Sequence, residues 1–240
     1  MKRYLILLLC PLILFSGCKK DDSELPSEVT LLSAEAKSAY TALLDETIEY
    51  ATEPEGGGYG SYDENSFAVY DIDLDGKSEL IIEYVTAPLA GNVTTVYDYD
   101  SETGLLHEEI KEFIGLTFFD NGAVKAELSH SSGYGGGNFW PYSLYKYDKP
   151  SDTYKLVGTV DAWDGVYIDS SVTGRDFPKD IDNDGDGFVY YISDGASPIN
   201  YDKPVDNAEY EAWIEAVIGD AEIMDIPFLS LTREHIAQIH

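Results

Sequence analysis

Cysteine is nearly absent from this sequence, since the 240 residues include only Cys10 and Cys18. Both lie close to the start of the chain. A disulfide framework, a cysteine zinc site and a cysteine nucleophile are therefore excluded for everything after residue 18. The remaining chain has to be stabilised by an apolar core, by hydrogen bonds or by an ion.

Positive charge is scarce as well. Lysine and arginine number 15 against 45 acidic residues, which gives a formal net charge of −30. Because such a surface repels phosphate groups and attracts cations, the charge balance argues against nucleic-acid binding and we expect no nucleic-acid partner. The 4 histidines form no H-E-x-x-H motif, and no G-x-S-x-G stretch is present. These absences favour a non-enzymatic role.

The apolar run at residues 4–15 has 12 residues, fewer than the roughly 20 that a membrane-spanning helix needs. Lys2 and Arg3 precede it, as in a signal peptide. The segment Phe15-Ser16-Gly17-Cys18 resembles the lipobox of bacterial lipoproteins. That resemblance implies a signal peptide at 1–17 and a diacylated Cys18, whose two acyl chains suffice for stable anchoring.

A lipid-anchored chain of this kind would lie on the extracytoplasmic face of a bacterial cell envelope. Residues 18–30 would then contain the lipidated cysteine and a polar tether, and residues 31–240 a single domain. The segment at 19–22, KKDD, resembles acidic export tags of surface lipoproteins but leaves the leaflet open. Ordinary secretion with cleavage elsewhere is the alternative.

Apolar and aromatic residues are plentiful, at 44% and 13% of the chain, which is enough for a folded core. Three- and four-residue spacing predicts a helix from Ser33 to about Ala51. A second helix is predicted at 208–218, capped by Asp206 or Asn207, and a final short one from Thr232 to His240.

The middle of the chain is rich in tyrosine, valine and threonine and is broken by turn residues. Asn121-Gly122 lies between two apolar runs, which is a strong signal for a β-hairpin, and residues 148–152 predict another turn. We therefore predict an α+β fold, mainly antiparallel β-sheet, with an N-terminal helix and C-terminal helices.

An acidic loop interrupts the apolar stretch FAVYDIDLDGKSELIIEYV at 67–85. Alternate side chains of a turning loop can converge on one centre, and carboxylate oxygens suit a hard cation such as Ca²⁺. Gly76 allows the sharp turn. An EF-hand is excluded because Ile82 stands where its last acidic ligand belongs. The expected ligands are Asp71, Asp73, Asp75, the carbonyl of Lys77, and Glu79.

This loop resembles the calcium loop of FG-GAP/VCBS-type β-repeats, in which aspartates run directly into a strand. The resemblance covers residues 67–85 and implies one Ca²⁺ site. More broadly, the chain resembles a loosely defined group of bacterial surface lipoproteins that have D-x-D-x-D-G loops and often no assigned activity. The alternative is an acidic Asp-Gly turn without an ion.

A second acidic loop, KDIDNDGDGFVYYISDG, lies at 179–195. Its candidate ligands are Asp180, Asp182, Asp184 and Asp186. The D-x-D-x-D-G pattern fits from Asp180 or, in a shifted register, from Asp182. The sequence is compatible with both registers.

We therefore expect a membrane-anchored lipoprotein with one or two structural Ca²⁺ sites and a binding or envelope role, with envelope glycan or protein as its partner. A secreted hydrolase acting on polysaccharide is one alternative, although no pair of acidic residues stands out by its spacing. A glycan-binding module is another, with Trp140 and Trp163 as candidate stacking residues.

Overall fold

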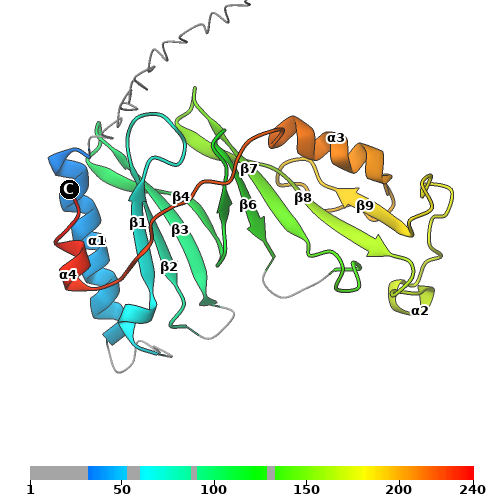
Figure 1. Cartoon of the computed structure of the whole chain (residues 1–240), viewed down its shortest axis with the longest axis horizontal. Helices are drawn as coiled ribbons and strands as arrows, with labels where there is room; N and C mark the ends of the chain where they lie inside the picture. The colour runs from blue at the N-terminus through cyan, green and yellow to red at the C-terminus, as the bar shows by residue number, and fades with distance from the viewer. Residues whose placement is uncertain (1–31, 53–59, 88–90, 129–132) are drawn as a thin grey trace, which may run out of the picture.

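The computed structural model describes residues 32–52, 60–87, 91–128 and 133–240 (Figure 1). The predicted signal peptide, Cys18 and the tether lie outside the described residues. Two antiparallel five-stranded sheets and several helices make up the described chain, which confirms the predicted α+β fold. Among the described residues, no helix is both long enough and apolar enough to cross a membrane.

The first sheet has the strand order β10-β1-β2-β3-β4. Helix α1 and the short helix α4 pack together at its outer side, on the left of Figure 1. The elements on this side of the molecule are α1 (Ala34–Thr52), the 3₁₀ helix η1 (Tyr62–Glu64), β1 (Ser66–Tyr70), β2 (Glu79–Tyr84), β3 (Val93–Asp100), β4 (Leu105–Phe113), β10 (Leu229–Ser230) and α4 (Arg233–Ile236).

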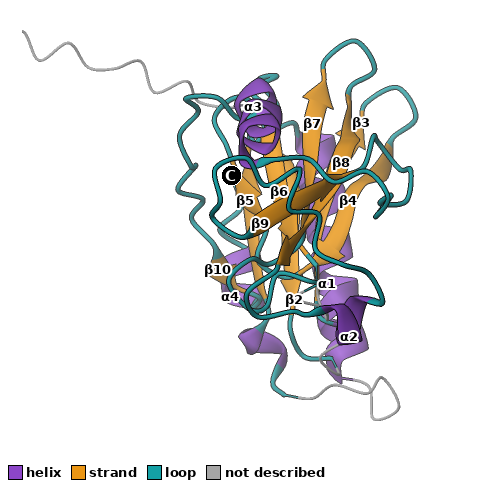
Figure 2. Ribbon diagram, turned by 90° about the vertical axis from the view of Figure 1, so that its right-hand side faces the viewer, coloured by secondary structure: helices purple, strands orange, loops and turns teal. Residues whose placement is uncertain are grey.

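The second sheet has the order β5-β6-β7-β8-β9, and α3 packs against β9. Figure 2 shows the strands filling the middle of the molecule with the helices around them. The elements on this side are β5 (Thr117–Phe118), β6 (Ala123–Glu127), β7 (Tyr142–Asp148), β8 (Thr153–Asp164), the short helix α2 (Ser170–Thr173), β9 (Phe188–Ile192) and α3 (Asn207–Val217).

Helix α1 forms where the apolar spacing predicts it. The Ser33 hydroxyl accepts a hydrogen bond from the Ala36 N–H at 3.0 Å, so Ser33 caps the helix as expected. One stripe of the helix is buried against the first sheet and against the C-terminal residues of the chain; it consists of Ala36, Tyr40, Leu44 and Ile48. This spacing of four residues places each side chain above the previous one.

The two sheets share an apolar core. Ile72, Ile81 and Ile110 of the first sheet and its loops pack with Val124 and Tyr154 of the second. At the same junction Glu109, the extra residue of a bulge in β4, accepts a hydrogen bond from the Tyr154 N–H at 2.8 Å. The sheets are therefore joined by both packing and a hydrogen bond.

The end of the chain crosses from the second sheet back to the first, as Figure 1 shows for the segment between α3 and α4. The Met224 N–H donates to the Phe118 carbonyl, and the Leu231 N–H donates to the Asn65 carbonyl. Thr232 caps α4 as predicted, but the helix ends at Ile236 and does not reach His240. The last N–H groups bond three residues back instead, which tightens the chain into turns.

Candidate metal centre

The first acidic loop joins β1 to β2 in the first sheet. It turns sharply because Leu74 and Gly76 have positive φ angles of 64° and 94°. Three aspartate carboxylates accept hydrogen bonds from N–H groups of the loop itself: Gly76 N to Asp71 at 3.1 Å, Asp75 N to Asp73 at 2.9 Å, and Lys77 N to Asp75 at 2.7 Å. The aspartates are thereby held in defined orientations.

Three of the predicted ligands meet at one point. Asp71, Asp73 and Glu79 each offer a carboxylate oxygen, and these oxygens lie within 4.8 Å of one another. Glu79 is only 1% exposed, and it accepts the Ile72 N–H at 2.8 Å. The buried Oδ1 of Asp71 has no hydrogen-bond partner among the described residues. This group of carboxylates could hold a metal ion.

The electrostatics of the group are unfavourable without a cation. Burial, with the charge of Asp73 as the next cause, raises the pKa of Glu79 to about 10. Burial also raises the pKa of Asp73 to about 7 and moves the pKa of Asp71 upward. Removing carboxylates from water while placing them side by side disfavours their charged forms. A bound divalent cation would reverse this preference.

Without divalent cations, Asp73 is expected to make stability fall as pH rises. Its pKa of about 7 in the folded state exceeds the value of about 3.9 in an unfolded chain, so between these limits only the folded state keeps the proton. Urea unfolding in chelator should show this fall in the wild type and a shallower one in Asp73→Asn. Equal slopes in the two proteins would contradict the assignment.

Lys77 and Asp152 extend the site toward the second sheet. The Lys77 ammonium lies 2.8 Å from Asp75 and 3.1 Å from Asp152, which belongs to the turn between β7 and β8. Asp73, Asp75 and Asp152 form a second, overlapping group of carboxylates within the same 4.8 Å limit. The sequence did not indicate Asp152, because only the docking of the two sheets brings it near residues 73 and 75.

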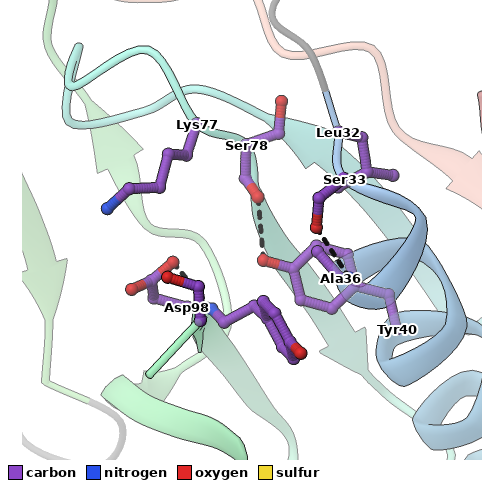
Figure 3. Close-up of a pocket in the computed structure, with 9 residues that line it drawn as sticks. Leu32, Ser33, Ala36, Tyr40, Lys77, Ser78 and Asp98 are labelled. Atoms are coloured by element: carbon purple, nitrogen blue, oxygen red, sulfur yellow. Dashed lines mark hydrogen bonds between the residues drawn. The ribbon is translucent and has the colours of Figure 1, made fainter. Parts of the chain in front are cut away.

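Contacts from both sides fix the position of the loop. In Figure 3 the Tyr40 hydroxyl of α1 points at Ser78, to whose carbonyl it donates a hydrogen bond of 2.8 Å. On the other side the Tyr154 hydroxyl donates to the Ile72 carbonyl at 3.2 Å. The cavity drawn in Figure 3, between α1 and Asp98, has a volume of about 110 Å³.

The second acidic loop also gathers carboxylates, but from a different set of residues. Asp182 and Asp184 lie with Asp206, with one oxygen of each within 4.8 Å of the others. Asp180 is exposed and is not part of this group. Asp186 accepts the Phe188 N–H at 2.7 Å and likewise lies outside the group. The sequence indicated Asp206 only as a helix cap.

The residues named for the alternative functions are placed as follows. Trp163 is 2% exposed and donates a hydrogen bond to the Ile168 carbonyl, so it belongs to the core, whereas Trp140 is 41% exposed. An acidic cleft of about 530 Å³ lies beside Lys77. Several of the carboxylates that line it accept backbone hydrogen bonds, including Asp100 from the nearby Glu102 N–H and Glu109 from the Tyr154 N–H of the other sheet.

Comparisons with protein families, curated proteins and solved structures found no match to this chain.

Proposed function

We propose that this chain is a lipid-anchored protein of the bacterial cell envelope in which the loop at 71–79 binds Ca²⁺ as a structural ion. Its role is non-enzymatic: the ion stabilises a domain that is held at the extracytoplasmic face for binding or for an envelope function. The observation that carries the calcium site is the convergence of Asp71, Asp73 and the buried Glu79 on one point. The proposed anchor is supported by the resemblance of residues 15–18 to a lipobox.

Calcium fits this loop better than softer metals do. The side chains that converge offer only carboxylate oxygens, which hard cations prefer, and Ca²⁺ tolerates the irregular geometry of a loop. The resemblance to FG-GAP/VCBS calcium loops supports the same ion. Because no histidine or cysteine belongs to the group, nothing in its ligands favours zinc or copper.

The place of the loop explains why an ion would matter for stability. The loop lies at the junction of the two sheets, where Ile72 joins the shared core and Lys77 reaches Asp152. An ion held by Asp71, Asp73 and Glu79 would relieve their mutual repulsion and fix the start of β2 relative to the end of β1. It would thereby stabilise the contact between the sheets.

The test of the proposal is thermal unfolding with and without calcium. Ca²⁺ at a hundredfold excess over its Kd should add about 2.7 kcal/mol, which corresponds to a rise in Tm of roughly 5–10 °C for a domain of this size. The Asp73→Asn variant keeps the acceptor for the Asp75 N–H but loses one charge, so it should lose most of this rise.

The matched control is Asp63→Asn, which removes the same charge from an exposed residue of η1. It should respond to calcium like the wild type. The proposal is wrong for this loop if the wild type melts at the same temperature in calcium and in chelator, or if Asp73→Asn keeps the full response.

The anchor has a test of its own. In a bacterial host that processes lipoproteins, the wild type should partition into the detergent phase, and Cys18→Ala should move to the aqueous phase because it cannot be acylated. Cys10→Ala is the matched control, since Cys10 would be removed with the signal peptide. Detergent partitioning of Cys18→Ala equal to that of the wild type would exclude lipidation at this residue.

A further inference from the structure

We propose that the loop at 182–187 forms, together with Asp206, a second binding site for a hard divalent cation such as Ca²⁺. Asp206 would supply from the start of α3 the acidic ligand that the loop itself lacks. This site is separate from the one at 71–79 and does not depend on it.

The backbone of the second loop repeats that of the first when Asp182 is counted as position 1. Position 6 is a glycine with positive φ in both loops, Gly76 at 94° and Gly187 at 87°. Position 4 also has a positive φ in both, with Leu74 at 64° and Gly185 at 74°. The register that starts at Asp182, and not the one that starts at Asp180, therefore matches the first loop.

The hydrogen bonds of the two loops correspond as well. In each loop the N–H groups at positions 5, 6 and 7 donate to the carboxylates at positions 3, 1 and 5. In the second loop these bonds are Asp186 N to Asp184 at 3.1 Å, Gly187 N to Asp182 at 3.2 Å, and Phe188 N to Asp186 at 2.7 Å.

Asp206 has the place that Glu79 has in the first loop. Position 2 of the first loop is Ile72, whose N–H donates to Glu79. Position 2 of the second loop is Asn183, whose N–H donates to Asp206 at 3.3 Å. Position 9 of the second loop is Tyr190, which cannot provide a carboxylate. Tyr190 and Val205 exchange backbone hydrogen bonds of 2.9 and 2.8 Å, and this pairing brings Asp206 beside the loop.

An independent observation points to a ligand at this place. Asp206 is only 6% exposed, and its buried Oδ1 has no hydrogen-bond partner among the described residues. Although Asp206 stands at the N-cap of α3, its side chain makes no capping hydrogen bond to the helix. Its Oδ2 accepts the Asn183 side-chain amide at 2.9 Å, and a carboxylate oxygen of Asp206 lies within 4.8 Å of oxygens from Asp182 and Asp184.

A buried carboxylate oxygen without a donor costs free energy unless something positive satisfies it. No lysine or arginine forms an ion pair with Asp206 among the described residues. A divalent cation between Asp182, Asp184 and Asp206 would provide the missing partner.

The experiment is a calorimetric titration of the purified full-length chain with Ca²⁺ at 150 mM NaCl, which screens weak attraction to the acidic surface. The wild type should bind two equivalents. Asp206→Ser should lose one Ca²⁺ equivalent or bind it at least 10–100-fold more weakly. Removing even a residue that only hydrogen-bonds to a metal ligand typically costs this much affinity. Serine suits an N-cap as well as aspartate does, so α3 should still form.

Two further variants keep the outcome decisive. Asp184→Asn should weaken binding of the same Ca²⁺ equivalent because it removes one of the charged ligands. Asp184 is exposed, so its replacement leaves the core intact. Asp220→Ser, a change at an exposed residue after α3, should bind both equivalents as the wild type does. Two equivalents of unchanged affinity in both Asp206→Ser and Asp184→Asn would overturn the second site.

The result also separates this site from the first. Asp73→Asn should keep the equivalent that Asp206→Ser loses. A wild type that binds one equivalent, lost in Asp73→Asn but kept in Asp206→Ser, would overturn the second site and leave the first intact. A wild type that binds one equivalent, kept in Asp73→Asn but lost in Asp206→Ser, would overturn calcium binding at 71–79 and support the site at Asp206.

Discussion

Replacing Ile72 with alanine is expected to lower the free energy of unfolding by about 2–5 kcal/mol, as truncation of a fully buried isoleucine does in other proteins. Ile72 is 0% exposed and packs in the core that both sheets share. The cavity left behind would lie between the sheets, where neither can close over it without moving the other. Chemical denaturation followed by fluorescence and by circular dichroism measures the change.

The matched control for this variant is Leu74→Ala. Leu74 belongs to the same loop and is 51% exposed, and its positive φ of 64° is disfavoured for leucine and alanine alike. Its truncation should change the free energy of unfolding by no more than about 0.5 kcal/mol. A similar cost for both variants, or a small one for Ile72→Ala, would show that the loop is not anchored in the shared core.

The second large effect is expected for Glu79→Gln, and its sign should depend on calcium. In chelator at pH 7 the variant should be at least as stable as the wild type, because burial raises the pKa of Glu79 to about 10 and the wild type must take up a proton on folding. Glutamine can still accept the Ile72 N–H. In calcium the variant should be the less stable protein, because it lacks the stabilisation from the first site, about 2.7 kcal/mol at a hundredfold excess over Kd.

The control for this reversal is Glu83→Gln, a change in the same strand at a residue that accepts a hydrogen bond from the Ser66 hydroxyl. It should not alter the response to calcium. The contrary result is that Glu79→Gln loses the same amount of stability, relative to the wild type, in chelator and in calcium. It would mean that Glu79 acts through hydrogen bonding alone.

Local patterns in the sequence predict the elements of this fold well. The Asn121-Gly122 turn joins β5 to β6, and Ser33 caps α1 as its spacing predicts. The first loop could be predicted to the same degree, because Asp71, Asp73 and Glu79 are neighbours in sequence and the turn at Gly76 suffices to bring them together. Where short-range geometry determines the structure, sequence was sufficient.

The remaining features depend on contacts between distant parts of the chain. Asp152 reaches the first loop because the turn between β7 and β8 lies beside it, and Asp206 reaches the second loop because Val205 pairs with Tyr190. Two possible registers of the second loop could not be separated from the sequence, since both fit the D-x-D-x-D-G pattern. The positive φ at Gly187 and the bond from its N–H to Asp182 distinguish them.

A crystal structure of the protein grown with millimolar Ca²⁺ tests the central claim most directly. The proposal predicts an anomalous peak between Asp71, Asp73 and Glu79, with carboxylate oxygens about 2.3–2.6 Å from the ion. Data from crystals grown in chelator should lack the peak. Two results would contradict the claim. In crystals grown with Ca²⁺, the loop could be well ordered and hold no ion, or the Lys77 ammonium could lie among these carboxylates.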